Sequence, residues 1–287
     1  MTGNILESFQ QWLLEDGKAV ATIESYMNDI RKFNDYLVEK DCDPEVLLSR
    51  FYFTSYMKHL EGMAVSTRNK KVNSLKVYND YLFKSRLVDD IFISIKRDKV
   101  KVAHGSEAEV SILNDQQVEQ FLFHLEKETQ RNKLIGYLLL YTGIRVSELV
   151  NIKITDVDQL TSHLTVKGKG KFREIPLRKD VLEAIQVYLQ GERGKSKFPE
   201  SPYLLVSQRA GKMHRDAVRR WLELTGKRLG FHIHPHKLRH TFCTRLLKNG
   251  VELSTVSKLA GHAGINMTVK YYINTSKEEK QNAVDLL

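Results

Sequence analysis

Residues 163–177 read HLTVKGKGKFREIPL, and this stretch decides the fold because it is the clearest strand pattern in the 287-residue chain. Leu164 and Val166, and after them Ile175 and Leu177, alternate with polar residues on either side of a glycine-containing turn. Alternation at a period of two around such a turn predicts a β-hairpin. Helical spacing prevails elsewhere, so we predict a mainly α fold with a small antiparallel sheet in its second half.

Apolar residues recur at helical spacing both before and after this hairpin. In residues 20–40, for example, Ile23, Met27, Ile30 and Phe33 would share one face of an amphipathic helix. The pattern predicts four helices in the first hundred residues, at 4–14, 20–40, 44–60 and 66–83. Later helices are predicted at 114–129, 131–141, a short one after Arg145, and then 179–190, 216–229, 236–249 and 254–261.

The helical periodicity fails between residues 96 and 114. Residues 96–106, KRDKVKVAHGS, are basic and polar and include a glycine, which is typical of an extended linker. A length of 287 residues allows about two domains. We therefore expect an N-terminal helical domain at 1–95, a linker at 96–112 and a second, mainly helical domain at 113–287.

The composition excludes several classes of protein. With 41% hydrophobic and 28% charged residues, the chain is globular and not disordered. No apolar stretch approaches the ~20 residues needed to cross a bilayer, and residues 1–14 lack a signal-peptide pattern, so we expect a soluble, unsecreted protein. Cys42 and Cys243 are the only cysteines, which excludes a disulfide framework and a cysteine-based zinc site and favours the reducing cytoplasm.

The net charge of +10 suggests a polyanion as partner, and the charge is unevenly distributed along the chain. Residues 1–50 carry 5 basic and 10 acidic side chains, whereas residues 51–100 carry 10 and 5. Residues 101–287 carry 30 and 20. A protein that presents one basic surface to a phosphate backbone would show this partition, and an ordinary mixture of surface lysines is the alternative.

The helix expected at 66–83 combines an apolar face with a basic face. Ser66 and Thr67 are its candidate N-caps. Its apolar residues suit a core, and its basic residues suit a DNA backbone. The candidate DNA-binding residues on this helix are Arg68, Lys70, Lys71 and Lys76.

Residues 142–149, TGIRVSEL, place Arg145 after a glycine turn and at the start of a short helix. Glu148, three residues later, could hold the guanidinium so that its fork faces a phosphate oxygen. An ordinary surface pair of Arg145 and Glu148 is the alternative.

The hairpin turn carries Lys167, Lys169 and Lys171. Lysines on a flexible turn most often contact phosphates. One that reaches a reacting centre can also donate a proton to a leaving oxygen.

Residues 234–240, HPHKLRH, predict a helix that begins at Pro235. His236 and Arg239 would lie one turn apart, near the edge of a face that is buried through Leu238. The alternative is a metal site made by the histidines at 232, 234, 236 and 240, although neither a cysteine nor a carboxylate accompanies them.

Residues 261–272, GHAGINMTVKYY, place His262 after a glycine that would end a helix. Tyr271 and Tyr272 follow nine and ten residues later. Taken singly, these tyrosines suit a core. Together with two arginines, a lysine and two histidines, a tyrosine suits phosphoryl transfer without a metal, because the cations neutralise the nonbridging oxygens while the phenol attacks.

These four motifs, in this order, resemble those of the tyrosine site-specific recombinases, the family of phage integrases and Xer proteins. They are TGIRVSEL at 142–149, KGKGKFREIPL at 167–177, HPHKLRHTF at 234–242, and LAGH at 259–262 followed by the tyrosine. The spacings fit as well, with 24 residues from Arg145 to Lys169 and nine from His262 to Tyr271. The resemblance covers nearly the whole chain and implies a core-binding domain and a catalytic domain that clamp a DNA duplex.

By this resemblance, Arg145 and Arg239 would clamp the scissile phosphate. Tyr271 would attack it to give a 3′-phosphotyrosyl enzyme and a free 5′-hydroxyl. Because this linkage conserves the energy of the phosphodiester, religation would need no cofactor, neither ATP nor a metal.

Lys169 would then be the general acid for the 5′-oxygen and His236 an acid/base group near the tyrosine. His262 would donate a hydrogen bond to the phosphate, and Glu148 would support Arg145 from behind. Lys167 and Lys171 would contact the DNA backbone.

Two departures from the family pattern bear on the role. Tyr272 lies beside Tyr271, and the spacing from His262 selects Tyr271 as nucleophile. Residues 271–276, YYINTS, replace the Tyr-Thr-His pattern of the Xer branch. This difference favours a recombinase of a mobile element, acting in cointegrate resolution or in integration and excision, over Xer-type resolution of chromosome or plasmid dimers.

The resemblance also implies the assembly and the place of action. Residues 277–287 predict an amphipathic tail suited to docking on a neighbouring subunit. The active species would be a tetramer on two synapsed double-stranded DNA sites, with no membrane partner. It would act on the nucleoid in a bacterial cytoplasm.

Two other functions remain open from the sequence. A topoisomerase of type IB uses a similar set of residues, and would relax any supercoiled DNA as a monomer. A DNA-binding regulator without catalytic activity could keep the fold, but pure binding would tolerate the loss of active-site residues that this chain retains.

Overall fold

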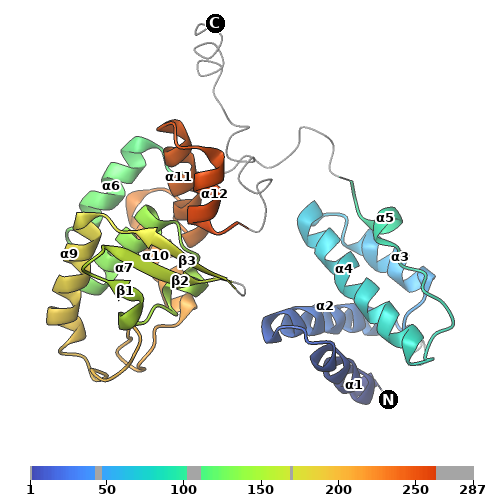
Figure 1. The fold of residues 1–287 in the computed structure, drawn as a ribbon. Helices are drawn as coiled ribbons and strands as arrows, with labels where there is room; N and C mark the ends of the chain where they lie inside the picture. Colours follow the sequence, from blue (N-terminus) through green and yellow to red (C-terminus); the bar gives the residue numbers. More distant parts are fainter. Residues whose placement is uncertain (1, 43–46, 102–110, 169–170, 263–287) are drawn as a thin grey trace, which may run out of the picture. The chain divides into compact units, whose positions relative to one another are not determined.

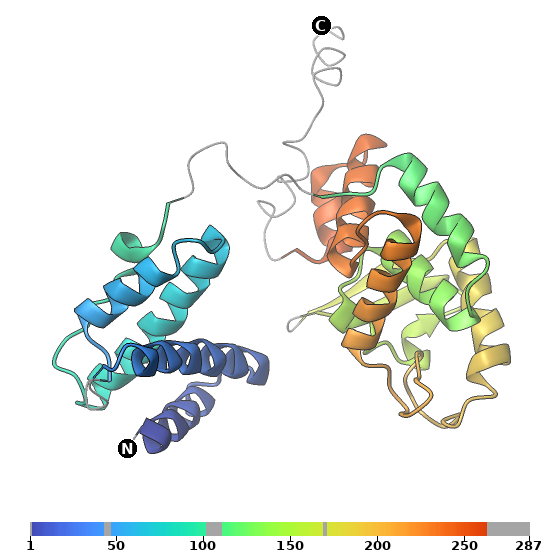
Figure 2. The same ribbon diagram turned by 180° about the vertical axis from the view of Figure 1, so that it is seen from behind.

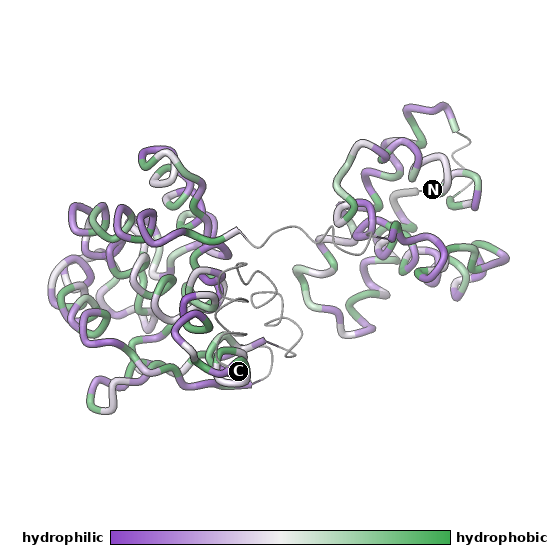
Figure 3. The backbone as a smooth tube through the Cα atoms, turned by 90° about the horizontal axis from the view of Figure 1, so that it is seen from above, coloured by the Kyte–Doolittle hydropathy of each residue, from purple (hydrophilic) through white to green (hydrophobic). Residues whose placement is uncertain are grey.

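The computed structural model describes residues 2–42, 47–101, 111–168 and 171–262. The chain divides into two compact units, residues 1–107 and 108–287 (Figure 1). Both are mainly helical, as predicted, and hydrophobic and hydrophilic residues alternate along the turns of their helices (Figure 3). Within the described residues, no helix is both long enough and apolar enough to span a bilayer.

The N-terminal unit is a group of helices around an aromatic core. It contains α1 (Thr2–Glu15), α2 (Val20–Glu39), α3 (Arg50–His59), α4 (Val65–Lys84) and α5 (Ile95–Asp98). Phe9, Phe33 and Tyr78 are among its fully buried side chains. Helix α2 packs against α1, α3 and α4, because its buried residues recur at helical spacing.

Two helix starts in this unit differ from the sequence prediction. Helix α3 begins at Arg50, not at residue 44, because the Ser49 side chain caps it by accepting from the backbone N–H of Tyr52 at 3.2 Å. Helix α4 begins one residue before the predicted caps: Ala64 is its N-cap, so Ser66 and Thr67 lie in its first turn.

The expectation of an extended linker from residue 96 is wrong for its first part. Residues 95–98 form helix α5, and the Asp98 carboxylate forms an ion pair with Arg50 at 2.7 Å. Farther along, the Asn69 side chain donates to the carbonyl of Val100 and accepts from its N–H. These contacts hold residues 95–100 against the N-terminal unit.

The second unit is built around helix α7. Its helices are α6 (Asp115–Leu125), α7 (Gln130–Thr142), α8 (Val146–Leu149), α9 (Lys179–Tyr188), α10 (Arg215–Leu229), α11 (Pro235–Lys248) and α12 (Leu253–Ala260). Short helical turns cover Ile154–Asp156 and Leu189–Arg193. Leu134, Leu138 and Leu139 of α7 are fully buried, because α9 and α11 both pack against this helix.

The predicted hairpin is confirmed as part of a three-stranded antiparallel sheet. Strands β1 (Val157–Asp158), β2 (His163–Lys167) and β3 (Phe172–Pro176) lie in the order β1-β2-β3. Leu164 pairs with Ile175, and Val166 pairs with Arg173. Figure 1 shows α9 beside this sheet, and the view from behind in Figure 2 shows α10 in front of it.

A buried charge cluster joins α2 to α4 in the N-terminal unit. Asp29, only 4% exposed, accepts from the Ser74 hydroxyl at 2.7 Å and pairs with Lys70 at 3.1 Å and Lys71 at 3.4 Å. Burial tends to raise the pKa of Asp29, but these hydrogen bonds and charges hold it below its usual value. Lys71 is 5% exposed and therefore does not present its charge to a DNA backbone, contrary to the prediction.

We expect Asp29→Ala to lower the free energy of unfolding of this unit by about 3 kcal/mol, because it leaves Lys71 buried without its counter-ion. Asp80→Ala, which breaks the partly exposed Lys76 pair, should cost at most ~1 kcal/mol. The measurement is urea unfolding of the full chain at pH 7 in a Trp221→Phe background, where Trp12 fluorescence reports this unit.

The loss in Asp29→Ala should also depend on pH. Since the folded pKa of Asp29 is lowered, its stabilisation is complete above the unfolded value of about 3.9 and disappears as the pH falls below it. Equal losses for Asp29→Ala and Asp80→Ala, or a loss that persists unchanged at pH 3, would contradict this assignment.

Candidate active site

Arg145 is placed by the sharp turn between α7 and α8. Gly143 ends α7 with φ +60°, a left-handed conformation that favours glycine. A side chain at Gly143 would also collide with the ring of Phe242. The predicted glycine turn is therefore confirmed, and Arg145 becomes the N-cap residue of α8.

Glu148 holds Arg145 from the first turn of α8. The backbone N–H of Arg145 donates to Oε2 of Glu148 at 2.8 Å, and its Nη1 donates to Oε1 at 2.9 Å. The side chain of Glu148 is 6% exposed and that of Arg145 is 36% exposed. This is not the surface pair of the alternative interpretation, because the carboxylate is buried.

A second arginine, Arg173 of strand β3, shares the Glu148 carboxylate. It donates from Nη1 to Oε1 at 3.1 Å and from Nη2 to Oε2 at 2.8 Å. Burial tends to raise the pKa of Glu148, but the bonds from Arg173 and from the backbone of Arg145 hold it below its usual value. Glu148 is therefore ionised at neutral pH.

Arg239 approaches the same place from α11. Arg239 is 2% exposed, so it lies within the buried face of the helix and not near the edge of that face as predicted. Its Nη1 donates to the carbonyl of Gly143 at 2.6 Å. Its Nη2 is buried and lacks a hydrogen-bond partner among the described residues. Burial and the nearby Arg145 lower the pKa of Arg239 to about 10, so it remains charged at pH 7.

The histidines of this region are neutral at pH 7. Burial, then Arg239 and Arg145, lower the pKa of His236 and lower that of His262 to about 4. His240, whose ring centroid lies 5.8 Å from that of His236, also has its pKa lowered to about 4 by burial and His236. Neutral imidazoles can both donate and accept hydrogen bonds. Pro235 is the first residue of α11, as predicted.

A groove of about 730 Å³ opens beside Arg145 and runs along the hairpin. Its lining is strongly basic, which suits a polyanion. The charged and histidine side chains that line it are Arg145, Glu148, Lys167, Lys171, Arg173, Lys258 and His262.

The structure thus brings together most of the predicted site residues that it describes. Those gathered around Arg145 and the groove are Arg145, Glu148, Lys167, Lys171, His236, Arg239 and His262. Lys169 and Tyr271, together with Tyr272 and the tail at 277–287, lie outside the described residues. Arg68, Lys70, Lys71 and Lys76 belong to α4 of the other unit.

Arg173 is the residue of this site that the sequence analysis missed. One signal was available. Arg173 lies two and four residues before Ile175 and Leu177, whose side chains are buried, and residues two apart along a strand point to the same face. An arginine on the apolar face of a hairpin needs an internal partner.

The histidine-rich segment at 232–240 is the alternative metal site that the sequence left open. Across the described ranges, His, Cys, Asp and Glu side chains form no group of three or more that is arranged to hold a metal ion.

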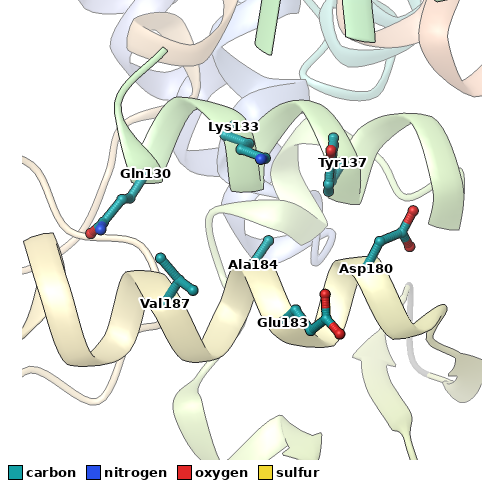
Figure 4. A pocket seen from close by; sticks show the side chains of 7 residues that line it. All are labelled: Gln130, Lys133, Tyr137, Asp180, Glu183, Ala184 and Val187. Carbon is teal, nitrogen blue, oxygen red and sulfur yellow. The ribbon is translucent and has the colours of Figure 1, made fainter. Parts of the chain in front are cut away.

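A separate pocket of about 220 Å³ lies between α7 and α9 (Figure 4). Gln130, Lys133 and Tyr137 of α7 face Asp180 and Glu183 of α9 across it. None of the predicted site residues lines this pocket.

Comparison with known proteins covers both units. Residues 111–279 match the model of the phage integrase family. The chain is 30% identical over 294 residues to the TnP I resolvase of Bacillus thuringiensis, covering 99% of this chain and 100% of the relative. It is also 36% identical over 174 residues to tyrosine recombinase XerA of Pyrococcus furiosus, covering 59% of each chain.

Solved structures share the fold. The XerH recombinase bound to its difH substrate superposes with a TM-score of 0.75 at 22% identity, covering 92% of this chain and 80% of that one. The Tn1549 transposon integrase in complex with transposon right end DNA has a TM-score of 0.71 at 20% identity, covering 99% of both chains. From the family match and the full-length relative, this chain belongs to the phage integrase family and is a tyrosine recombinase, an enzyme that breaks and rejoins DNA.

Proposed function

We propose that this chain is the site-specific recombinase of a mobile element, acting in cointegrate resolution or in integration and excision. It would exchange strands through a 3′-phosphotyrosyl intermediate and a Holliday junction, without ATP or a metal. The full-length similarity to a protein named as a resolvase supports the mobile-element role. The partial match to XerA leaves Xer-type dimer resolution as the second candidate.

The observation that carries the chemistry is an excess of positive charge among the described residues of the site. Arg145, Arg173 and Arg239 lie around one carboxylate, that of Glu148, while the histidines are neutral. The lowered pKa of Arg239 records the cost of holding it buried near Arg145. A phosphodiester gains negative charge as a nucleophile adds to it, so this site stabilises the transition state more than the ground state.

Arg145 and Arg239 would contact the two nonbridging oxygens of the scissile phosphate. Arg145 is partly exposed to the groove, and Nη2 of Arg239 has no partner in the described ranges. Both guanidiniums are already held by protein acceptors, Glu148 and the carbonyl of Gly143. They therefore need little reorganisation when the phosphate arrives.

The histidines would divide the proton chemistry and the hydrogen bonding. His236, neutral at pH 7, could accept the phenolic proton of the attacking Tyr271. His262 would donate a hydrogen bond to a phosphate oxygen. Lys169, which the sequence places between the residues of β2 and β3, would protonate the leaving 5′-oxygen.

DNA binding would extend beyond the reacting phosphate. Lys167 and Lys171 flank the hairpin turn and line the groove, where they would contact neighbouring phosphates. In the N-terminal unit, Arg68, Lys70 and Lys76 remain candidate backbone contacts. We infer a tetramer on two synapsed DNA sites, acting on the nucleoid in a bacterial cytoplasm, with the tail at 277–287 docked between subunits.

We expect Tyr271→Phe to abolish covalent trapping on a nicked suicide duplex while binding to the specific site stays within about twofold of wild type, because only the nucleophilic oxygen is lost. Tyr272→Phe is the matched control and should retain trapping. The measurement is the DNA adduct on a denaturing gel. Adduct in Tyr271→Phe combined with its loss in Tyr272→Phe would assign the nucleophile to Tyr272.

Lys169→Ala should slow cleavage of an ordinary phosphodiester by about 100-fold, the usual contribution of a general acid. A 5′-bridging phosphorothiolate has a leaving group that needs little protonation, so it should restore most of the lost rate. Lys171→Ala, two residues away in the sequence, should show no such rescue. If the phosphorothiolate fails to rescue Lys169→Ala, this lysine is not the acid.

The rate of cleavage by the wild type should fall when the pH drops below the lowered pKa of His236, because protonation removes the base that accepts the phenolic proton. In single-turnover trapping between pH 5 and pH 8, His236→Asn should be slower and should lack this acidic limb. His232→Asn, at an exposed histidine, should keep the wild-type profile. The same acidic limb in His236→Asn would remove His236 from this role.

A further inference from the structure

Arg173 connects three separate segments of the second unit. It lies on β3 opposite Val166, and its side chain is 13% exposed. Both Nη atoms donate to the Glu148 carboxylate on α8. Its Nε donates in addition to the carbonyl of Leu259, near the end of α12, at 2.9 Å. All three nitrogens of the guanidinium are therefore engaged by the protein.

The absence of a side chain at Gly261 leaves room for this arginine. It ends α12 with φ +65°, and a Cβ on it would lie 2.7 Å from Nη1 and 2.9 Å from Cζ of Arg173. The guanidinium thus occupies the space that a side chain at position 261 would need. In addition, Nη2 of Arg145 donates to the carbonyl of Gly261 at 2.9 Å. Two arginines that share Glu148 hold the two residues flanking Ala260.

The carbonyls that they bind are among those that a helix cannot satisfy itself. The last carbonyls of an α-helix lack intrahelical donors and carry the negative end of its dipole. Cations at Leu259 and Gly261 fix where α12 stops and how the chain leaves it. The next residue is His262, which lines the groove.

Stability alone is a poor account of this arrangement. A buried ion pair is often no more stabilising than an apolar pair of the same volume. An apolar side chain at position 173 would nevertheless leave the Leu259 carbonyl without this donor and would not fill the space beside Gly261 in the same way. A lysine would keep the charge but could not make the paired bonds.

We propose that Arg173 is a positioning residue that sets the place of His262, by binding the Leu259 carbonyl and packing against Gly261 with Glu148 as its anchor. This inference rests on the proposed function, in which His262 donates a hydrogen bond to the phosphate. Arg173 itself does not contact the reacting atoms in this assignment.

The first test is a double-mutant cycle with single-turnover trapping at saturating DNA. Arg173→Lys should slow trapping about tenfold, with DNA affinity within about twofold of wild type. In a His262→Gln background the same change should slow trapping less than about twofold, because the group that it positions is already gone. An equal slowing in both backgrounds would overturn the proposal.

Arg178→Lys is the matched control. Arg178 follows the same strand but is 60% exposed, and it pairs with Asp180 instead of Glu148. It should trap at the wild-type rate in both backgrounds. Gly261→Ala disturbs the same contact by adding a Cβ next to the guanidinium while Arg173 itself is unchanged. It should also slow trapping in the wild-type background and have little effect in the His262→Gln background.

The second test does not depend on activity. In NMR titrations of the full chain, the chemical shifts of the His262 ring protons should change in Arg173→Lys. The pKa of His262 should also rise from about 4, because a less firmly held His262 is more exposed to water. Arg178→Lys should leave both unchanged. An unchanged His262 signal in Arg173→Lys would overturn the proposal. Absence of any adduct with the wild-type chain would instead count against the proposed function, and the titration would still decide the role of Arg173.

Discussion

The second unit depends on one buried carboxylate. Glu148 receives hydrogen bonds from the backbone and Nη1 of Arg145 and from two nitrogens of Arg173. A buried charge is tolerated only when it is paired and hydrogen-bonded, so α8, the hairpin and the end of α12 must be in place together. The groove, the arginine fork and the position of His262 all follow from this arrangement.

The two units treat buried charge in opposite ways. In the N-terminal unit, Asp29 is matched by Lys70, Lys71 and a hydroxyl, and this cluster joins two helices. In the second unit, three arginines surround a single carboxylate, and Nη2 of Arg239 has no partner in the described part of the chain. Among the described residues, the first cluster pairs its carboxylate fully, whereas the second leaves Nη2 of Arg239 without an acceptor. This difference is what supports the proposal that the second cluster binds a phosphate.

Much of the fold could be predicted from the sequence, because amphipathic periodicity and glycine turns are local. The hairpin, the helix start at Pro235 and the helix ends at Gly143 and Gly261 were all predicted correctly. One error arose where a distant contact decides, because α5 is held by the ion pair between Arg50 and Asp98, which are 48 residues apart in the sequence. The start of α3 was missed for a local reason, because Ser49 caps the helix by accepting from the backbone N–H of Tyr52. Lys71 was assigned to DNA because its pairing with Asp29 on another helix leaves no trace in the local pattern.

The sequence by itself determined the mainly α class, the hairpin, and the order of arginine, lysine, histidine and tyrosine motifs that marks the family. Only the tertiary structure decided which charges of the described residues are paired and which are not. The reason is physical: periodicity reflects neighbours along the chain, whereas the bonds from Arg145 to Gly261 and from Arg173 to Leu259 span 116 and 86 residues. Burial and partnership of a charge therefore emerge only when those segments meet.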